Sequence, residues 1–191
     1  MSFRNPVTDE TVTIKSDIPD DMKNLMNGVF FNMEKIASFQ VDHTKFGTGM
    51  YISRTDDDIV TYDVRMVRPN GGKYISNPSL HTIEHIFATY ARNSEFGKNV
   101  IYVGPMGCRT GFYLLTRGLS HENAIKLVRD AYQYISEYEG DIMGCSAVEC
   151  GNYLEHDLQS AKTDVLPLLR RLQHYTVEML DYSWHYGKEI F

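Results

Sequence analysis

The segment His81-Thr82-Ile83-Glu84-His85 constrains the fold of this 191-residue chain more than any other part of the sequence. Two histidines four residues apart lie on one face of an α-helix, so both imidazoles can reach one metal ion. Glu84 projects from nearly the same face and can transfer protons beside that metal. The order H-x-x-E-H is the inverted form of the H-E-x-x-H zinc-peptidase signature. The pattern therefore predicts a helix that carries a metal site.

The sequence around this motif supports a helix. Asn77-Pro78-Ser79 is typical of a helix start, and apolar residues follow at helical spacing as far as Ala91. Strands are predicted at 50–54, 59–67, 100–103 and 111–116, and further helices at 22–33, at 120–138 and after His156, the last with a kink at Pro167. Because the strands come mostly as hairpins and the helices interrupt them singly, the predicted fold class is α+β, with an antiparallel β-sheet packed against a few α-helices.

The composition is that of a soluble globular domain, with 42% hydrophobic and 23% charged residues. The formal net charge is −6 and no cluster of lysine or arginine interrupts it, so no nucleic-acid partner is expected. No apolar run approaches the length of a membrane span, and the N-terminus lacks the apolar core of a signal peptide. We therefore expect no membrane partner and a cytoplasmic location.

The metal site needs a third ligand, and the three cysteines are candidates. An odd number of cysteines argues against a disulfide framework. Cys150 precedes the last predicted helix, where a ligand can arrive from elsewhere in the fold. Cys145, five residues earlier, would make a fourth ligand, and the spacing leaves this open. Three protein ligands leave a position for water or substrate, whereas four make a closed structural site.

Cys108 lies in a glycine-flanked turn, Pro105-Met106-Gly107-Cys108-Arg109-Thr110-Gly111. The following arginine and a nearby metal would favour a reactive thiolate. The alternative is a small buried apolar side chain. The turn alone does not decide between them.

Together these segments resemble the S-ribosylhomocysteine lyases (LuxS), which make the precursor of autoinducer-2. The resemblance runs from about Ala37 to about Leu172. It rests on motifs in the family's order: Ser38-Phe39-Gln40-Val41-Asp42-His43, Tyr62-Asp63-Val64-Arg65 with Pro69-Asn70, His81 to His85, Pro105 to Tyr113, and Cys150-Gly151-Asn152-Tyr153 with His156-Asp157-Leu158 and Ala161.

The resemblance implies a metal-dependent carbon–sulfur lyase that converts S-ribosylhomocysteine to homocysteine and 4,5-dihydroxy-2,3-pentanedione. It implies His81, His85 and Cys150 as metal ligands, with water in the open position. The expected ion is Fe²⁺, which Zn²⁺ or Co²⁺ can replace, and no organic cofactor is needed. Cys108 and Glu84 would be the two groups that transfer protons.

The resemblance also implies that Ser38, His43 and Arg65 line the substrate pocket. The expected assembly is a homodimer with its active sites at the interface, where the segment with Ser38 and His43 reaches across. Residues 1–36 are expected to form an N-terminal extension, 37–172 the catalytic domain and 173–191 a tail packed on it. Quorum sensing and homocysteine recycling in the activated methyl cycle are both compatible with this chemistry.

The sequence departs from the family at one position near Cys108, and the HxxEH motif also allows two interpretations other than a lyase. The family usually has an acidic residue six positions before the catalytic cysteine, in an Asp-Ile-Ser-Pro-Met-Gly-Cys run, and this chain has Tyr102 there. An inverted-motif metallopeptidase would take Glu149 or Glu155 as third ligand. A structural His₂Cys₂ zinc site in an interaction module would use Cys145 with Cys150.

Overall fold

The structure, a computed structural model, describes residues 2–13, 17–23 and 34–187, and the chain forms two compact units, Met1–Ile36 and Ala37–Phe191. The first unit contains an antiparallel hairpin of β1 (Ser2–Arg4) and β2 (Thr11–Thr13). Most of the helix predicted at 22–33 lies outside the described residues.

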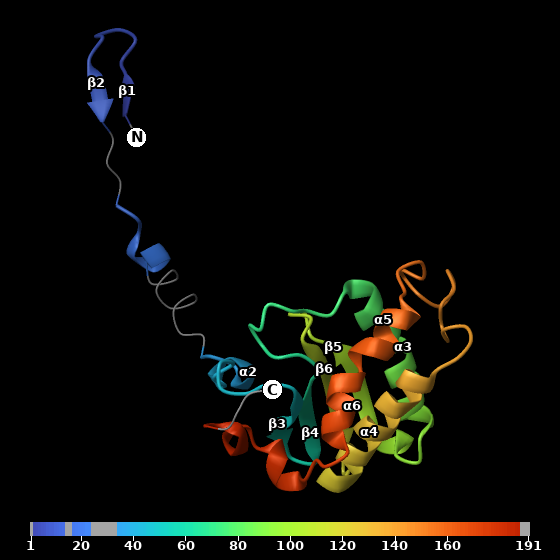
Figure 1. The fold of residues 1–191 in the computed structure, drawn as a ribbon. Coiled ribbons are helices and arrows are strands. Elements are labelled where there is room, and N and C mark those ends of the chain that lie inside the picture. Colours follow the sequence, from blue (N-terminus) through green and yellow to red (C-terminus); the bar gives the residue numbers. More distant parts are fainter. Residues whose placement is uncertain (1, 14–16, 24–33, 188–191) are drawn as a thin grey trace. The chain divides into compact units, whose positions relative to one another are not determined.

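The second unit is built on a four-stranded antiparallel sheet in the order β3-β4-β6-β5 (Figure 1). The predicted strands are confirmed with small extensions at their ends, except that β4 stops two residues earlier than expected. Their bounds are β3 (Gly49–Asp56), β4 (Ile59–Arg65), β5 (Val100–Pro105) and β6 (Gly111–Arg117).

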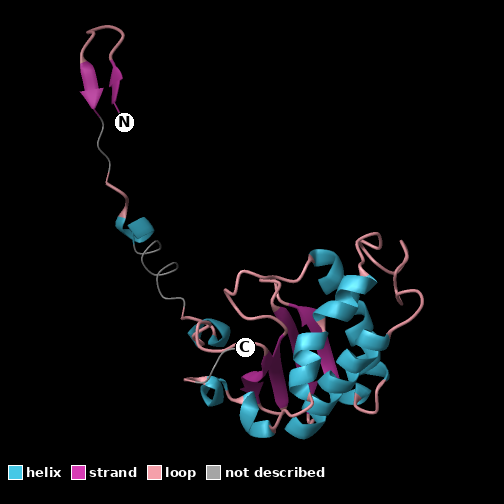
Figure 2. Ribbon diagram, viewed as in Figure 1, coloured by secondary structure: helices cyan, strands magenta, loops and turns pink. Residues whose placement is uncertain are grey.

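The larger helices of this unit cover one face of the sheet (Figure 2). The predicted α+β class is therefore confirmed. The helices are α2 (Ala37–Gln40), α3 (Asn77–Asn93), α4 (His121–Glu137), α5 (Leu158–Asp164) and α6 (Leu166–Leu172), and the 3₁₀ turns are η1 (Gly97–Asn99), η2 (Val177–Leu180) and η3 (Tyr182–His185). In the described part of the chain, no helix has the length and apolar character needed to span a membrane.

Local sequence signals set the helix ends. The Ser76 hydroxyl accepts a hydrogen bond from the backbone N–H of Ser79 and caps α3, and Pro78 fits the first turn because its missing N–H needs no partner there. Pro167 lies in the first turn of α6 for the same reason. The predicted kink is thus a break between two short helices.

The two faces of the sheet have different surroundings. Residues directly opposite one another on paired strands share a face. The face under α3 and α4 is apolar and fully buried, and it carries Met50, Tyr62, Val64, Val103, Phe112 and Leu114. The other face carries Tyr51, Thr61, Asp63, Tyr102, Tyr113 and Leu115. On this second face, Tyr51 and Asp63 are buried, whereas Tyr102 is 48% exposed.

Candidate active site

Four donor side chains converge near the first turns of α3. His81 and His85 lie on α3, and Cys150 and His156 lie in the segment before α5. Their ligand atoms all lie within 4.8 Å of one another, and all four residues are half-buried. The sulfur of Cys150 lies 3.3 Å from Nε2 of His81. A group of imidazole and thiolate donors suits a divalent ion such as zinc or iron(II).

Backbone groups orient these donors. Nδ1 of His81 donates to the carbonyl oxygen of Glu155 at 2.9 Å, and Nδ1 of His85 donates to that of Met143 at 2.9 Å. This arrangement turns Nε2 of each ring, the nitrogen that would bind a metal, away from the backbone carbonyl. The backbone N–H of Asn152 donates to the sulfur of Cys150 at 3.4 Å.

His156 is the member of this group to which we assigned no role from the sequence, although its spacing of six residues from Cys150 was a usable signal. The Thr82 hydroxyl donates to the carbonyl oxygen of Pro78 at 2.8 Å. Nδ1 of His156 lies 3.3 Å from the same hydroxyl oxygen, so the ring donates its Nδ1 proton there. This leaves a lone pair on Nε2, which is buried and has no hydrogen-bond partner among the described residues.

The electrostatics of His156 also suit a metal site. Burial lowers the pKa of His156 below its usual range, and the nearby His81 and His85 lower it further, so the ring is neutral at pH 7. The ring stacks on His81 with centroids 4.0 Å apart. A neutral imidazole with a buried, unpaired lone pair beside three other donors fits a metal centre.

The residues that a metallopeptidase or a His₂Cys₂ zinc site would need as metal ligands are hydrogen-bonded to other groups. Sγ of Cys145 donates to the carbonyl oxygen of Tyr153 at 3.1 Å. The Glu149 carboxylate accepts from the Ser146 hydroxyl at 2.6 Å, and that of Glu155 accepts from the side chain of Asn152. Within the described ranges, Cys145, Glu149 and Glu155 are not part of the donor group.

Two clefts flank the turn that carries Cys108 and share its residues Pro105, Met106 and Gly107. The first, of about 590 Å³, contains His81 and Glu84. The second, of about 450 Å³, contains Cys108 together with the predicted substrate residues Ser38, His43 and Arg65. The structure thus brings these four into one cleft and places Glu84 with His81 in the next. Ser38 and His43 line this cleft within the same chain as Cys108.

The Cys108 turn is fixed by close backbone packing. Arg109, after the cysteine, has a left-handed φ of 58°, and its N–H donates to the carbonyl oxygen of Met106 at 2.9 Å. A Cβ at Gly111 would lie 2.1 Å from the carbonyl oxygen of Val64, so only glycine lets β6 approach β4 here. The turn presents Cys108 as an exposed thiol rather than a buried apolar side chain.

The arginine beside the sulfur of Cys108 is Arg65, not the following Arg109 as the sequence suggested. Nη1 of Arg65 lies 3.7 Å from Sγ, and the Thr110 hydroxyl lies 3.0 Å from it. The guanidinium of Arg109 instead lies over the ring of Tyr74, 5.8 Å from its centroid. The sulfur of Cys108 therefore has a guanidinium and a hydroxyl within hydrogen-bonding reach.

Arg65 is held by a buried ion pair with Asp63, and both residues are 2% exposed. Nε and Nη2 of Arg65 donate to the two carboxylate oxygens of Asp63 at 3.0 and 2.5 Å. Burial disfavours the charged guanidinium, but the charge of Asp63 and its hydrogen bonds outweigh burial and raise the pKa of Arg65. The bidentate pair fixes the guanidinium plane, and with it the contact to Cys108.

Comparison with known proteins agrees with this geometry. The S-ribosylhomocysteinase (LuxS) family model matches residues 36–178. The chain belongs to the LuxS family. It is 40% identical to the S-ribosylhomocysteine lyase of Phocaeicola vulgatus, over 78% of this chain and 98% of the relative. It is 44% identical to that of Clostridium beijerinckii (68% and 86%) and 42% identical to that of Borreliella afzelii (78% and 99%).

Tyr102 departs from the usual LuxS motif, and a second departure accommodates it. A Cβ at Gly104 would lie 1.9 Å from Oη of Tyr102, so the tyrosine ring lies across this glycine. A serine at this position would require the half-exposed ring of Tyr102 to shift.

Proposed function

We propose that this protein is an S-ribosylhomocysteine lyase that releases homocysteine and 4,5-dihydroxy-2,3-pentanedione. The observation that carries the proposal is the arrangement of His81, His85 and Cys150 in one cluster, next to a turn that exposes Cys108 beside Arg65. Family membership adds to it, because the relatives carry that enzyme name. The ribosyl thioether would lie along the two clefts that share the Cys108 turn.

His81, His85 and Cys150 are the proposed metal ligands, and Fe²⁺ is the proposed ion, with Zn²⁺ or Co²⁺ able to replace it. When bound, such an ion supplies Lewis acidity that makes the carbons next to a sugar carbonyl more acidic. His81 also lines the larger cleft, so a substrate there has access to the cluster. His156 is proposed to support the cluster by packing on His81 and donating to Thr82.

Cys108 and Glu84 are the proposed proton carriers. The Cys108 thiolate removes the proton from C2 of the opened ribose and returns it to C1, which moves the carbonyl from C1 to C2. Glu84 transfers protons between oxygens, and the second shift moves the carbonyl to C3. A proton then leaves C4 as the C5–S bond breaks, and homocysteine departs as the thiol after taking up a proton. Each group alternates between acid and base, so no oxidant or reductant is consumed.

Ser38, His43 and Arg65 are the proposed substrate-binding residues. All three line the cleft of Cys108. Nδ1 of His43 donates to the carbonyl oxygen of Val41 at 2.9 Å, which leaves its Nε2 free to accept from a substrate hydroxyl or ammonium group. Arg65 is already engaged with Asp63 and Cys108, so its larger contribution is to the thiolate.

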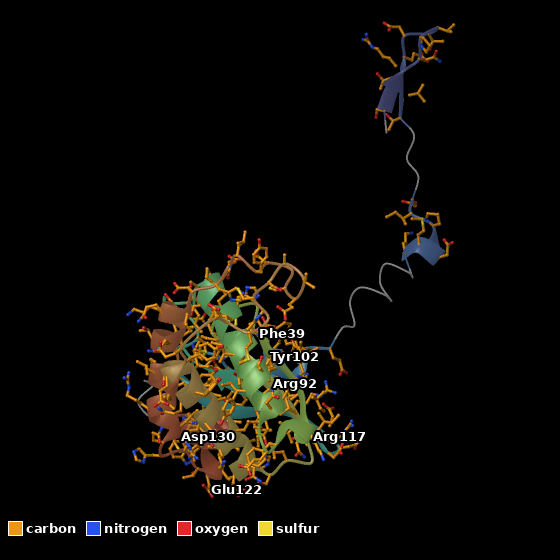
Figure 3. All side chains as sticks on the ribbon, turned by 90° about the vertical axis from the view of Figure 1, so that its right-hand side faces the viewer. Phe39, Arg92, Tyr102, Arg117, Glu122 and Asp130 are labelled. Carbon is orange, nitrogen blue, oxygen red and sulfur yellow. The ribbon has the colours of Figure 1, made fainter. Side chains whose placement is uncertain are left out.

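A homodimer with active sites at the interface is the proposed assembly. The second sheet face is exposed at β5 in the single chain, where β5 is an edge strand and Tyr102 is 48% exposed. Phe39, which lines the Cys108 cleft, is 71% exposed (both residues are labelled in Figure 3). Exposed aromatic residues at the rim of a cleft suit an interface that also borders the active site.

The assembly is tested by light scattering after size-exclusion chromatography. We expect the wild type at twice the mass of one chain, and Phe39→Glu to shift towards the single chain because it would bury a charge in the interface. Tyr134→Glu is the matched control, since Tyr134 is 39% exposed on α4, which packs on the other face of the sheet. A wild type that elutes as a single chain would contradict the proposal.

The activity is tested with protein purified without oxygen, by measuring thiol release from S-ribosylhomocysteine. We expect stoichiometric homocysteine from the Fe²⁺-loaded protein and none after chelation. Peptide hydrolysis in the same preparation would favour the inverted-motif metallopeptidase. Absence of both activities from metal-loaded protein would favour the structural zinc site.

The organisation proposed for the chain follows from this assignment. The catalytic domain is residues 37–172, preceded by an extension of residues 1–36 and followed by the tail from 173 to 191, and the enzyme is proposed to act in the cytoplasm. Its product is compatible with autoinducer-2 synthesis and quorum sensing as well as with homocysteine recycling.

A further inference from the structure

The C-terminal segment after α6 packs along β3 and is anchored by buried side chains (Figure 1). The hydroxyl of Tyr175 accepts from the backbone N–H of Met50 at 3.0 Å and lies 2.7 Å from the carbonyl oxygen of the same residue. His185 is 5% exposed, and Nε2 of its ring donates to the carbonyl oxygen of Met179 at 2.9 Å. These contacts fix the backbone of η2 and η3 on the sheet.

The same segment inserts Tyr182 on the second face of the sheet. Its ring stacks on Tyr51, with centroids 4.6 Å apart and an angle of 7° between the planes. The edge of Phe46 meets it at 4.8 Å. The hydroxyl donates to Oδ2 of Asp63 at 2.9 Å. Burial and the charge of Asp63 raise the pKa of Tyr182, so the hydroxyl keeps its proton and remains a donor.

Asp63 connects this hydroxyl to the reactive cysteine. Its Oδ2 accepts from both Tyr182 and Nη2 of Arg65, and Nη1 of the same guanidinium faces Sγ of Cys108 at 3.7 Å. The donation from Tyr182 fixes the carboxylate plane and offsets part of its negative charge. Both effects leave more of the positive charge of Arg65 directed at the sulfur.

We propose that Tyr182 is a positioning residue for Cys108 and acts through Asp63 and Arg65. The C-terminal tail would then help to set the reactivity of the active site. The inference rests on the proposed function only in taking Cys108 as the reactive group. Tyr182 lies beyond residues 36–178, the stretch matched by the family model. This chain therefore contributes to its site from outside the matched domain.

The test is the rate at which iodoacetamide alkylates Cys108, read by mass spectrometry of the peptide that contains it, because Cys145 and Cys150 are also free. We expect Tyr182→Phe to slow alkylation at pH 7 by about fivefold, the effect of one ordinary hydrogen bond, because Tyr182 acts on the sulfur only through Asp63 and Arg65, and to lower kcat for homocysteine release by a similar factor. The rates of variant and wild type should converge at pH 9, where thiols are largely ionised.

Tyr186→Phe is the matched control, because Tyr186 is in the same tail and its ring faces Lys45 at 5.5 Å instead of the site. It should leave both rates unchanged. Among the described residues, Arg65, His43, Tyr74 and Tyr113 are the titratable groups that line the cleft with Cys108, and none of them is altered in either variant. An alkylation profile for Tyr182→Phe that matches wild type at every pH would overturn the proposal.

A double-mutant cycle separates positioning from general loosening of the tail. Because Tyr182 is proposed to act through Arg65, Tyr182→Phe should have no further effect on alkylation in an Arg65→Lys background. If the double variant were slowed by the product of the two single effects on the alkylation rate, Tyr182 would not act through Arg65. Alkylation requires no turnover, so a wild type without lyase activity would refute the proposed function and leave this test intact.

Discussion

Replacing Cys108 by alanine is expected to lower kcat for homocysteine release by about 10³-fold or more, and replacing Glu84 by glutamine by about 10²- to 10⁴-fold. Each change removes one of the two groups that move protons along the ribose chain. Neither residue belongs to the donor group of His81, His85, Cys150 and His156, so both variants should keep their metal. The measurement is thiol release under anaerobic conditions, with metal content determined on the same samples.

Cys145→Ser is the control for Cys108→Ala. It also removes a free thiol, but the thiol of Cys145 donates a hydrogen bond to the carbonyl oxygen of Tyr153 and lines neither cleft. We expect its activity to stay within about twofold of wild type. Substantial lyase activity in Cys108→Ala would exclude Cys108 as a proton carrier and leave Glu84 to carry both shifts.

The parts of the fold that depend on local sequence could be predicted. The helix at 77–93 combines a serine cap, a proline in its first turn and a continuous apolar stripe. All three signals favour a helix that begins at this point. The strands likewise follow from short β-rich runs between turn residues. The four-residue helix α2 and the 3₁₀ turns of the tail are too short to show a periodic spacing of apolar residues, so the sequence does not predict them.

The grouping of the donor side chains could be predicted in part from spacing, and the contacts that support Cys108 could not. His81 and His85 share a helical face, so spacing alone brings them together. The partnership of Tyr182 with Asp63 joins positions 119 residues apart, and only the packed sheet places them in contact. The choice of Arg65 over Arg109 beside Cys108 is likewise decided by strand pairing, since Arg65 lies opposite Gly111 at the end of β4.

Replacing Cys150 by alanine is expected to release the metal, lowering its content from about one ion per chain to a small fraction of that. A three-ligand site that loses its thiolate retains only two imidazoles, which bind divalent ions far more weakly. The measurement is metal analysis by mass spectrometry after anaerobic purification and desalting. Cys145→Ser should retain full metal, because the sulfur of Cys145 lies outside the donor group.

His156→Ala decides whether the site is open or closed. If three ligands hold the ion and His156 only supports His81, the variant should keep close to one ion per chain, with affinity lowered by about tenfold, as for other residues that orient metal ligands. Loss of metal as complete as in Cys150→Ala would make His156 a fourth ligand. A site closed by four protein ligands has no position for a substrate oxygen, and a structural site of three histidines and Cys150, different from the His₂Cys₂ site considered above, would then replace the lyase. The buried Nε2 of His156 is thus the atom on which the two interpretations differ most.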